Sequence, residues 1–124
     1  MNCSASSLRG LVWFLLLSIS AFAHAADSAS AEGRKIDFLI ASIETLQGAQ
    51  FIRNGTAYNA KAAADHLRLK LRMAGSRVST ADDFIRLCAS ASSVSGTPYQ
   101  IRFTDGSAVT SEAYFRQKLI EFKP

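Results

Sequence analysis

The 124-residue sequence predicts a single small α+β domain of about four helices and two short β-hairpins. Three observations support this fold class. Apolar residues recur at helical spacing in separate stretches after residue 33. Two turn dipeptides, Asn54-Gly55 and Asp105-Gly106, each lie between short segments with strand-like composition. No internal repeat or low-complexity tract interrupts residues 34–124, so we expect one domain over that range.

The first 25 residues have the three parts of a secretory signal. A polar stretch carrying Arg9 precedes the apolar run 11–22, and the run ends at Ala23-His24-Ala25, with small residues where a signal peptidase reads. The stretch 10–25 has 16 residues, fewer than the roughly 20 that a spanning helix needs. We therefore expect cleavage after Ala25 and a mature protein outside the cytoplasm that does not span the membrane.

Removing residues 1–25 limits the chemistry that the mature chain can carry. One cysteine, Cys88, and one histidine, His66, remain, and the formal charge falls from +4 to +3. A single thiol excludes a disulfide within the mature chain, and a lone Cys and a lone His cannot supply the ligands of a zinc site. We expect no metal and no cofactor. The small, polar stretch 26–33 predicts a flexible leader.

A helix, a hairpin and a second helix are predicted after the leader. The range 34–48 has apolar residues at helical spacing, namely Ile36, Leu39, Ile40, Ile43 and Leu46. Asn54-Gly55 predicts a tight hairpin within 51–58, because both residue types tolerate positive φ. Asn59 is placed to cap a helix over 60–74, and Gly75 is placed to end it.

The predicted helix 60–74 has two chemically distinct sides. The expected buried stripe is Ala63, Ala64, Leu67, Leu71 and Ala74. The opposite side carries Lys61, Asp65, Arg68 and Arg72. At this spacing Asp65 can pair with a cation one turn before it or after it.

The C-terminal part of the chain predicts a third helix, a second hairpin and a fourth helix. Thr80 and Asp83 resemble a capping box for a helix over 81–91. Its expected buried residues are Phe84, Leu87, Cys88 and Ala91. Alternating apolar residues over 99–103 predict a half-buried strand, which Asp105-Gly106 returns antiparallel. Thr110 or Ser111 is expected to cap the last helix, with Phe115, Leu119 and Phe122 on one face.

Four segments of the chain resemble the DUF5329 (YfeK-like) family of small exported bacterial proteins. The segments are FIRNG (51–55), HLRLK (66–70), RVSTADDFI (77–85) and SSVSGTPY (92–99). The resemblance covers nearly all of residues 34–122, and the linked segments are more specific than any one of them. The family has no established activity, so the resemblance implies an exported, periplasmic location and supplies no mechanism.

No catalytic motif stands out in the sequence. Ser90, Ser92, Ser93 and Ser95 cluster near the end of the third predicted helix, and His66 could serve as their base in a hydrolase of unrecognised class. The serines lack the G-x-S-x-G frame, and small hydroxyl residues often satisfy backbone groups where a helix breaks. Cys88 lies on the predicted buried stripe, which favours a structural role. We therefore expect a protein that is not an enzyme.

Basic residues are concentrated in one part of the chain. Residues 53–86 contain seven cations and three acids, giving this segment a net charge of +4. A basic patch usually indicates nucleic acid, but export argues against that partner. The remaining candidates are an anionic envelope ligand or an acidic protein, while a solvated helix face with internal ion pairs is the structural alternative.

The first hairpin and the helix after it form the predicted binding site. Its residues are Arg53, Asn54, Tyr58, His66, Arg68 and Lys70. An arginine fork beside an aromatic ring suits an anionic ligand or an acidic peptide end. In the structural alternative, Arg53 pairs with an internal acid such as Asp37. The function predicted is a small exported binding or interaction module, with an accessory subunit of an envelope assembly as a further alternative.

Overall fold

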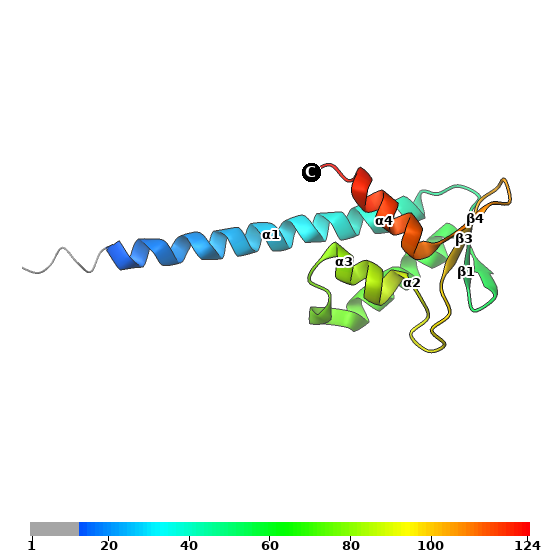
Figure 1. The fold of residues 1–124 in the computed structure, drawn as a ribbon, viewed down its shortest axis with the longest axis horizontal. Coiled ribbons are helices and arrows are strands. Elements are labelled where there is room, and N and C mark those ends of the chain that lie inside the picture. Colours follow the sequence, from blue (N-terminus) through cyan, green and yellow to red (C-terminus); the bar gives the residue numbers. More distant parts are fainter. Residues whose placement is uncertain (1–12) are drawn as a thin grey trace, which may run out of the picture.

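The elements follow the order expected of an α+β domain. The computed structural model describes residues 13–124, with side chains from His24 onward (Figure 1). The elements are α1 (Trp13–Glu44), β1 (Gln50–Arg53), β2 (Thr56–Tyr58), α2 (Ala60–Ala74), η1 (Gly75–Arg77), α3 (Ala81–Phe84), η2 (Ile85–Ala89), β3 (Gln100–Arg102), β4 (Ala108–Thr110) and α4 (Ser111–Glu121). The predicted fold class is confirmed.

Helix α1 is longer than the sequence pattern predicted. It includes residues 26–33, so the expectation of a flexible leader there is wrong as regards local structure. One physical reason is Glu32, whose carboxylate accepts a hydrogen bond from the backbone N–H of Ala81 (2.7 Å) and pairs with Lys35. These contacts tie the stretch to the start of α3. At the other end, α1 stops at Glu44, before the predicted residue 48, where Gly48 has a φ of +70°.

The predicted export signal overlaps the start of α1. Its basic end, residues 1–9, and the start of its apolar run lie outside the described residues, and Ala25 lies within the helix. Residues 24–30 are exposed on the part of α1 that projects beyond the other elements (Figure 1). Over the part of the chain that the structure describes, no helix combines the length and apolar character needed to cross a bilayer.

The two predicted hairpins join into one antiparallel sheet of order β2-β1-β3-β4. Asn54 and Gly55 form the first turn with φ of +50° and +78°, as the dipeptide predicted. In the centre of the sheet, Phe51 lies opposite both Tyr58 on β2 and Ile101 on β3. Directly paired residues share a face of a sheet. Phe51 and Ile101 are buried, so this face carries the core while the other face is open to solvent.

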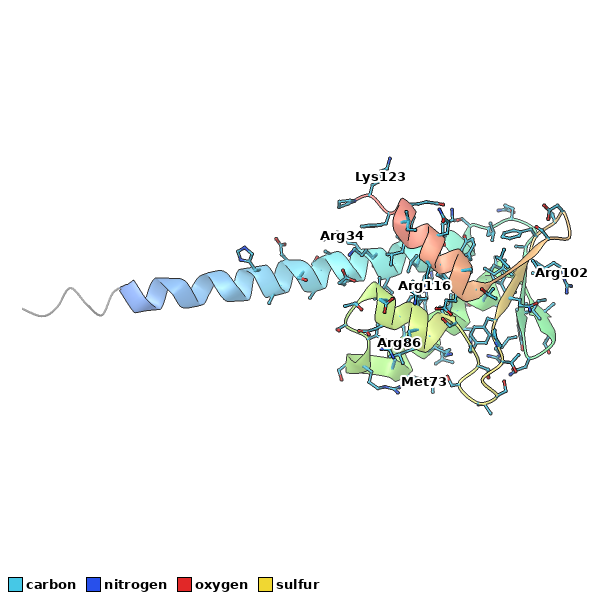
Figure 2. The ribbon with its side chains drawn as sticks, viewed as in Figure 1. Arg34, Met73, Arg86, Arg102, Arg116 and Lys123 are labelled. Carbon is cyan, nitrogen blue, oxygen red and sulfur yellow. The ribbon has the colours of Figure 1, made fainter. Side chains whose placement is uncertain are left out.

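The helices close the core over that buried face. Phe84 of α3 meets Phe115 of α4 edge to face, with ring centroids 6.0 Å apart. Phe38 of α1 and Phe122 after α4 make a similar contact at 5.4 Å. Arg116, labelled in Figure 2, joins α4 to the start of α3 through an ion pair with Asp82 (2.8 Å). Residues far apart in the chain therefore hold α1, α3 and α4 together.

The third predicted helix begins as expected but ends differently. Thr80 and Asp83 form the capping box, and the α-helical turn then widens into the π-helical turn η2. The wider turn changes which side chains face inward. Ile85 and Ala89 are fully buried with Phe84 and Cys88, while Leu87 and Ala91, predicted to be buried, are only half-buried.

Candidate functional site

A pocket of about 200 Å³ lies between α2 and the buried face of the sheet. Its best-covered walls come from Ile43 of α1, Leu67 of α2 and Phe115 of α4. Polar residues also line it, namely Arg53, His66, Tyr99, Gln100 and Ser111. Small, largely apolar pockets with a few polar groups are typical of ligand sites. This pocket is therefore the candidate site.

Arg53 stands at the end of β1, beside the Asn54-Gly55 turn. It follows Phe51 by two residues, so it lies on the helix-covered face of the sheet. Its guanidinium Nη1 is 2.9 Å from Nδ1 of His66, and its Cζ lies 5.3 Å from the centroid of the Tyr58 ring. Among the described residues, no carboxylate pairs with Arg53. The alternative in which Arg53 pairs with Asp37 is wrong.

A chain of polar contacts leads from Arg53 to Lys70. Nε2 of His66 is 3.4 Å from the hydroxyl of Tyr99, and Nζ of Lys70 donates to the same hydroxyl at 3.2 Å. Nζ of Lys70 also donates to the carbonyl oxygen of Ala91 (3.0 Å) and lies over the Tyr99 ring. We call Arg53, His66, Tyr99 and Lys70 the Arg53–Lys70 cluster. Two cations stand at its ends, and two groups that can accept hydrogen bonds lie between them.

These surroundings favour the neutral form of His66. Burial lowers the pKa of its imidazole, and the positive charges of Arg53 and Lys70 lower it further. A guanidinium has only donors, so the ring nitrogen that faces Arg53 must accept. A neutral histidine leaves the charge of Arg53 uncompensated. The cluster is therefore a positively charged group beside an apolar pocket.

Ser111 adds a polar group to an otherwise well-covered part of the pocket. The residue is 6% exposed, and its hydroxyl has no hydrogen-bond partner among the described residues. Among the described residues, every fully buried side-chain oxygen or nitrogen has a hydrogen-bond partner. The Ser111 hydroxyl therefore retains contact with open space, and the pocket is the space that Ser111 borders. Thr110, not Ser111, caps α4.

Two of the predicted site residues have other roles. Arg68 does not line the pocket and pairs with Glu44 (2.6 Å) and Asp65 (3.4 Å), so the structure does not bring it together with the other predicted site residues. Asn54 accepts a hydrogen bond from the hydroxyl of Ser95 (2.7 Å). It holds the 92–97 loop against the hairpin. The structure does bring Arg53, Tyr58, His66 and Lys70 together.

The serine cluster does not meet His66 in the described contacts. The hydroxyl of Ser90 donates to the carbonyl oxygen of Ile85, and the hydroxyl of Ser92 accepts from the backbone of Val94 and Ser95. These bonds satisfy backbone groups where the helix ends. Cys88 is buried, and burial raises the pKa of its thiol. Neither feature supplies the activated nucleophile that the hydrolase alternative requires.

Sequence reasoning missed Tyr99 and Ser111 as site residues. The alternating pattern over 99–103 predicts Tyr99 on the inward side of a strand, and that inward position is the available signal. The sequence predicts Ser111 only as a possible helix cap. Both reach the pocket because β1 pairs with β3 and because α4 packs beside α1. Neither arrangement follows from local sequence patterns.

Comparison with known proteins places the chain in a family. The model of DUF5329, a family of unknown function, matches residues 30–123. The uncharacterized protein YfeK of Salmonella typhimurium is 40% identical over 85 residues, which cover 68% of this chain and 68% of that protein. No solved structure matches the chain. The chain belongs to the DUF5329 family.

Proposed function

We propose that this DUF5329 protein is an exported, periplasmic binding module that takes an anionic ligand at the pocket beside the Arg53–Lys70 cluster. The proposal concerns binding and includes no reaction. Export rests on the signal pattern of residues 1–25, which provides a basic end, a short apolar run and a small-x-small exit. The ligand class rests on the geometry of the cluster.

The observation that carries the proposal is an uncompensated guanidinium beside an apolar pocket. Arg53 contacts neutral His66 and the Tyr58 ring, and Lys70 contacts a hydroxyl and a carbonyl oxygen. Within residues 24–124, neither cation has a carboxylate partner. An arginine fork in such a place matches a carboxylate or phosphate, whose charge would complete the cluster.

Comparison of two arginines tests this assignment. The purified protein is titrated with small anions (benzoate, glutamate and inorganic phosphate) while its backbone and arginine side-chain NMR signals are followed. We expect shifts at Arg53, His66 and Lys70, loss of these shifts in Arg53→Gln, and their retention in Arg68→Gln. Equal shifts around Arg68 in the wild type, or undiminished binding by a folded Arg53→Gln variant, would contradict the assignment.

Export has its own measurement. Intact-mass analysis of the protein recovered from the periplasm should give a chain that begins at Ala26 and lacks Cys3. A species that retains residues 1–25, or recovery only from the cytoplasm, would exclude the exported form. Neither result depends on what the pocket binds.

A further inference from the structure

We propose that the ligand is the C-terminal end of a polypeptide whose last residue is tyrosine or a similar aromatic residue with a polar tip. This inference rests on the proposed function, because it names the ligand class of the same pocket. Three observations support the inference. They are the size of the pocket, the polar groups at the two ends of the pocket and the apolar surface beside the pocket.

The size of the pocket fits one side chain. Its volume of about 200 Å³ is below the range of roughly 300–1,000 Å³ that is usual for sites of drug-sized ligands. The space corresponds to about six or seven water molecules. Ile43, Phe51, Leu67 and Phe115 supply apolar walls. A single aromatic side chain fits this volume and these walls.

The polar groups define the two ends of the ligand. Arg53 and His66 are half-buried, so they lie nearer to solvent than Ser111 and Phe115, which are buried. An arginine fork at the outer end matches a terminal carboxylate. The unpartnered hydroxyl of Ser111 at the covered end can bond to the phenolic hydroxyl of an inserted tyrosine. A phenylalanine would leave that hydroxyl without a partner.

A row of residues on α2 indicates a polypeptide rather than a free aromatic acid. Ala62 and His66 line the pocket, and Leu69 and Met73 continue the same helix face at spacings of three and four residues. Leu69 is 46% exposed, and Met73, labelled in Figure 2, is 72% exposed. Adjacent exposed apolar side chains of this kind give a surface for residues that precede the terminal tyrosine. A free aromatic acid would not reach them.

Binding of short peptides tests each part separately. The probes are the pentapeptide Ser-Leu-Ala-Leu-Tyr with a free carboxylate, its C-terminal amide, versions ending in Phe or Ala, and N-acetyltyrosine. Affinities are measured by calorimetry with the purified protein. We expect the amide to bind about 10- to 100-fold more weakly, as for loss of a charge-assisted hydrogen bond. The Tyr peptide should exceed the Phe peptide by about 3- to 10-fold, and the Ala peptide should bind most weakly.

Two variants connect these effects to named residues. Ser111→Ala should abolish the preference for Tyr over Phe without weakening the Phe peptide, and its hydroxyl makes no hydrogen bond that the fold would lose. The double variant Leu69→Ser, Met73→Ser changes only exposed side chains, so circular dichroism should show an intact fold. It should weaken the pentapeptide several-fold and leave N-acetyltyrosine unchanged.

Each failure has a distinct meaning. Equal binding of acid and amide, or no preference among Tyr, Phe and Ala, would overturn the inference. Equal affinity for N-acetyltyrosine and the pentapeptide would show that the ligand is a free aromatic acid, not a chain end. If benzoate or phosphate shifts the signals of Arg53 and no peptide binds, this inference fails while the proposed function stands. If no anion binds at the cluster, both fail.

Discussion

Helix α2 carries cations on two sides, and the two sides differ in how their charges are balanced. On one side, Lys61 pairs with Asp65 (2.7 Å) and Arg68 pairs with Glu44 (2.6 Å), while the exposed Arg72 has no carboxylate partner among the described residues. These pairs lower the pKa of both carboxyl groups and raise the pKa of both bases. On the other side, Lys70 and the nearby Arg53 have no carboxylate partner among the described residues and contact an imidazole, a hydroxyl and a carbonyl oxygen. We call these the paired face and the unpaired face.

The difference shows that the density of basic residues does not identify the candidate site. Residues 53–86 have a net charge of +4, but three of their seven cations, Arg72, Arg77 and Arg86, belong neither to these ion pairs nor to the Arg53–Lys70 cluster. The carboxylates of Asp65 and Glu44 occupy one face because α1 and α2 pack side by side there. The missing carboxylate partners and the half-buried position of Arg53 and Lys70, rather than the number of cations, separate the face that we propose for an anion from a solvated helix face.

The largest expected effect comes from removing a residue that supports both faces. Leu67 is buried in the centre of α2 and also lines the pocket. Leu67→Ala should lower the free energy of unfolding by about 2–5 kcal/mol, because it removes buried methyl groups and leaves a cavity. Urea denaturation measures the loss. A change below about 0.5 kcal/mol would mean that α2 is held mainly by its polar faces.

A smaller effect is expected at the start of α2. The side chain of Asn59 accepts a hydrogen bond from the backbone N–H of Ala62 (2.8 Å). Asn59→Ala should cost about 0.5–2 kcal/mol of stability, and Asn59→Gly only a few tenths. Thermal denaturation of the two variants separates the lost cap from a general effect of substitution. Equal melting temperatures would contradict a capping role.

The unpaired face should respond to pH in a range where the paired face does not. The pKa of His66 is lowered in the folded protein by burial, Arg53 and Lys70, so the unfolded chain binds a proton more readily. The resulting stability is full above the unfolded pKa of about 6.5 and declines as the pH falls from there towards the lower folded pKa.

Substitution of the histidine isolates this contribution. The wild-type melting temperature should fall between pH 7.5 and pH 5.5, and His66→Gln should reduce that fall. Asp83 provides a second, separate pH range, because its hydrogen bonds with Ser79 lower its pKa to about 2. Stability that depends on Asp83 is lost only as the pH falls from about 4 towards 2. If the melting temperature of His66→Gln fell between pH 7.5 and pH 5.5 by as much as that of the wild type, the role of His66 would be contradicted.

The smallest effect is expected on the paired face itself. Glu44→Gln removes the nearer of the two carboxylates that pair with Arg68, and the side chains of Glu44 and Arg68 are both well exposed. Surface ion pairs of this kind contribute little because solvent screens them. The melting temperature should change little, and the change should shrink further in high salt. In Glu44→Gln, the NMR signals of Arg68 should then shift on addition of anions, as they do not in the wild type. Arg68 would in this way respond to anions as Arg53 is expected to.

Much of the fold could be predicted from short-range patterns. The Asn54-Gly55 hairpin, the Asn59 cap and the Thr80–Asp83 capping box all form where their residues predicted. Each depends on contacts within a few residues, where turn and capping chemistry decide the result. The π-helical turn η2 was not predicted, because no local signal indicates where a helical turn widens. The helical state of 26–33 was also missed, since its stabilising contact comes from distant Ala81.

The candidate site shows the same limit. Arg53, Tyr58, His66 and Lys70 were found because they come from one hairpin and the helix that follows it. Tyr99 and Ser111 belong to a later strand and helix, and they join the pocket only through the pairing of β1 with β3 and the packing of α4. Arg68 was misplaced because its partner Glu44 lies on α1. Tertiary packing decided these three positions.

The packing of α1 against α4 affects when the pocket can form. The Tyr114 hydroxyl of α4 donates to the carbonyl oxygen of Ser42 on α1, and Phe115 completes a pocket wall that Ile43 begins. During synthesis, Ile43 emerges from the ribosome long before Phe115 exists. The pocket therefore cannot close on a growing chain, and a nascent or truncated protein presents an open apolar surface in its place. The ligand binding that we propose is therefore expected only of protein chains whose synthesis has finished.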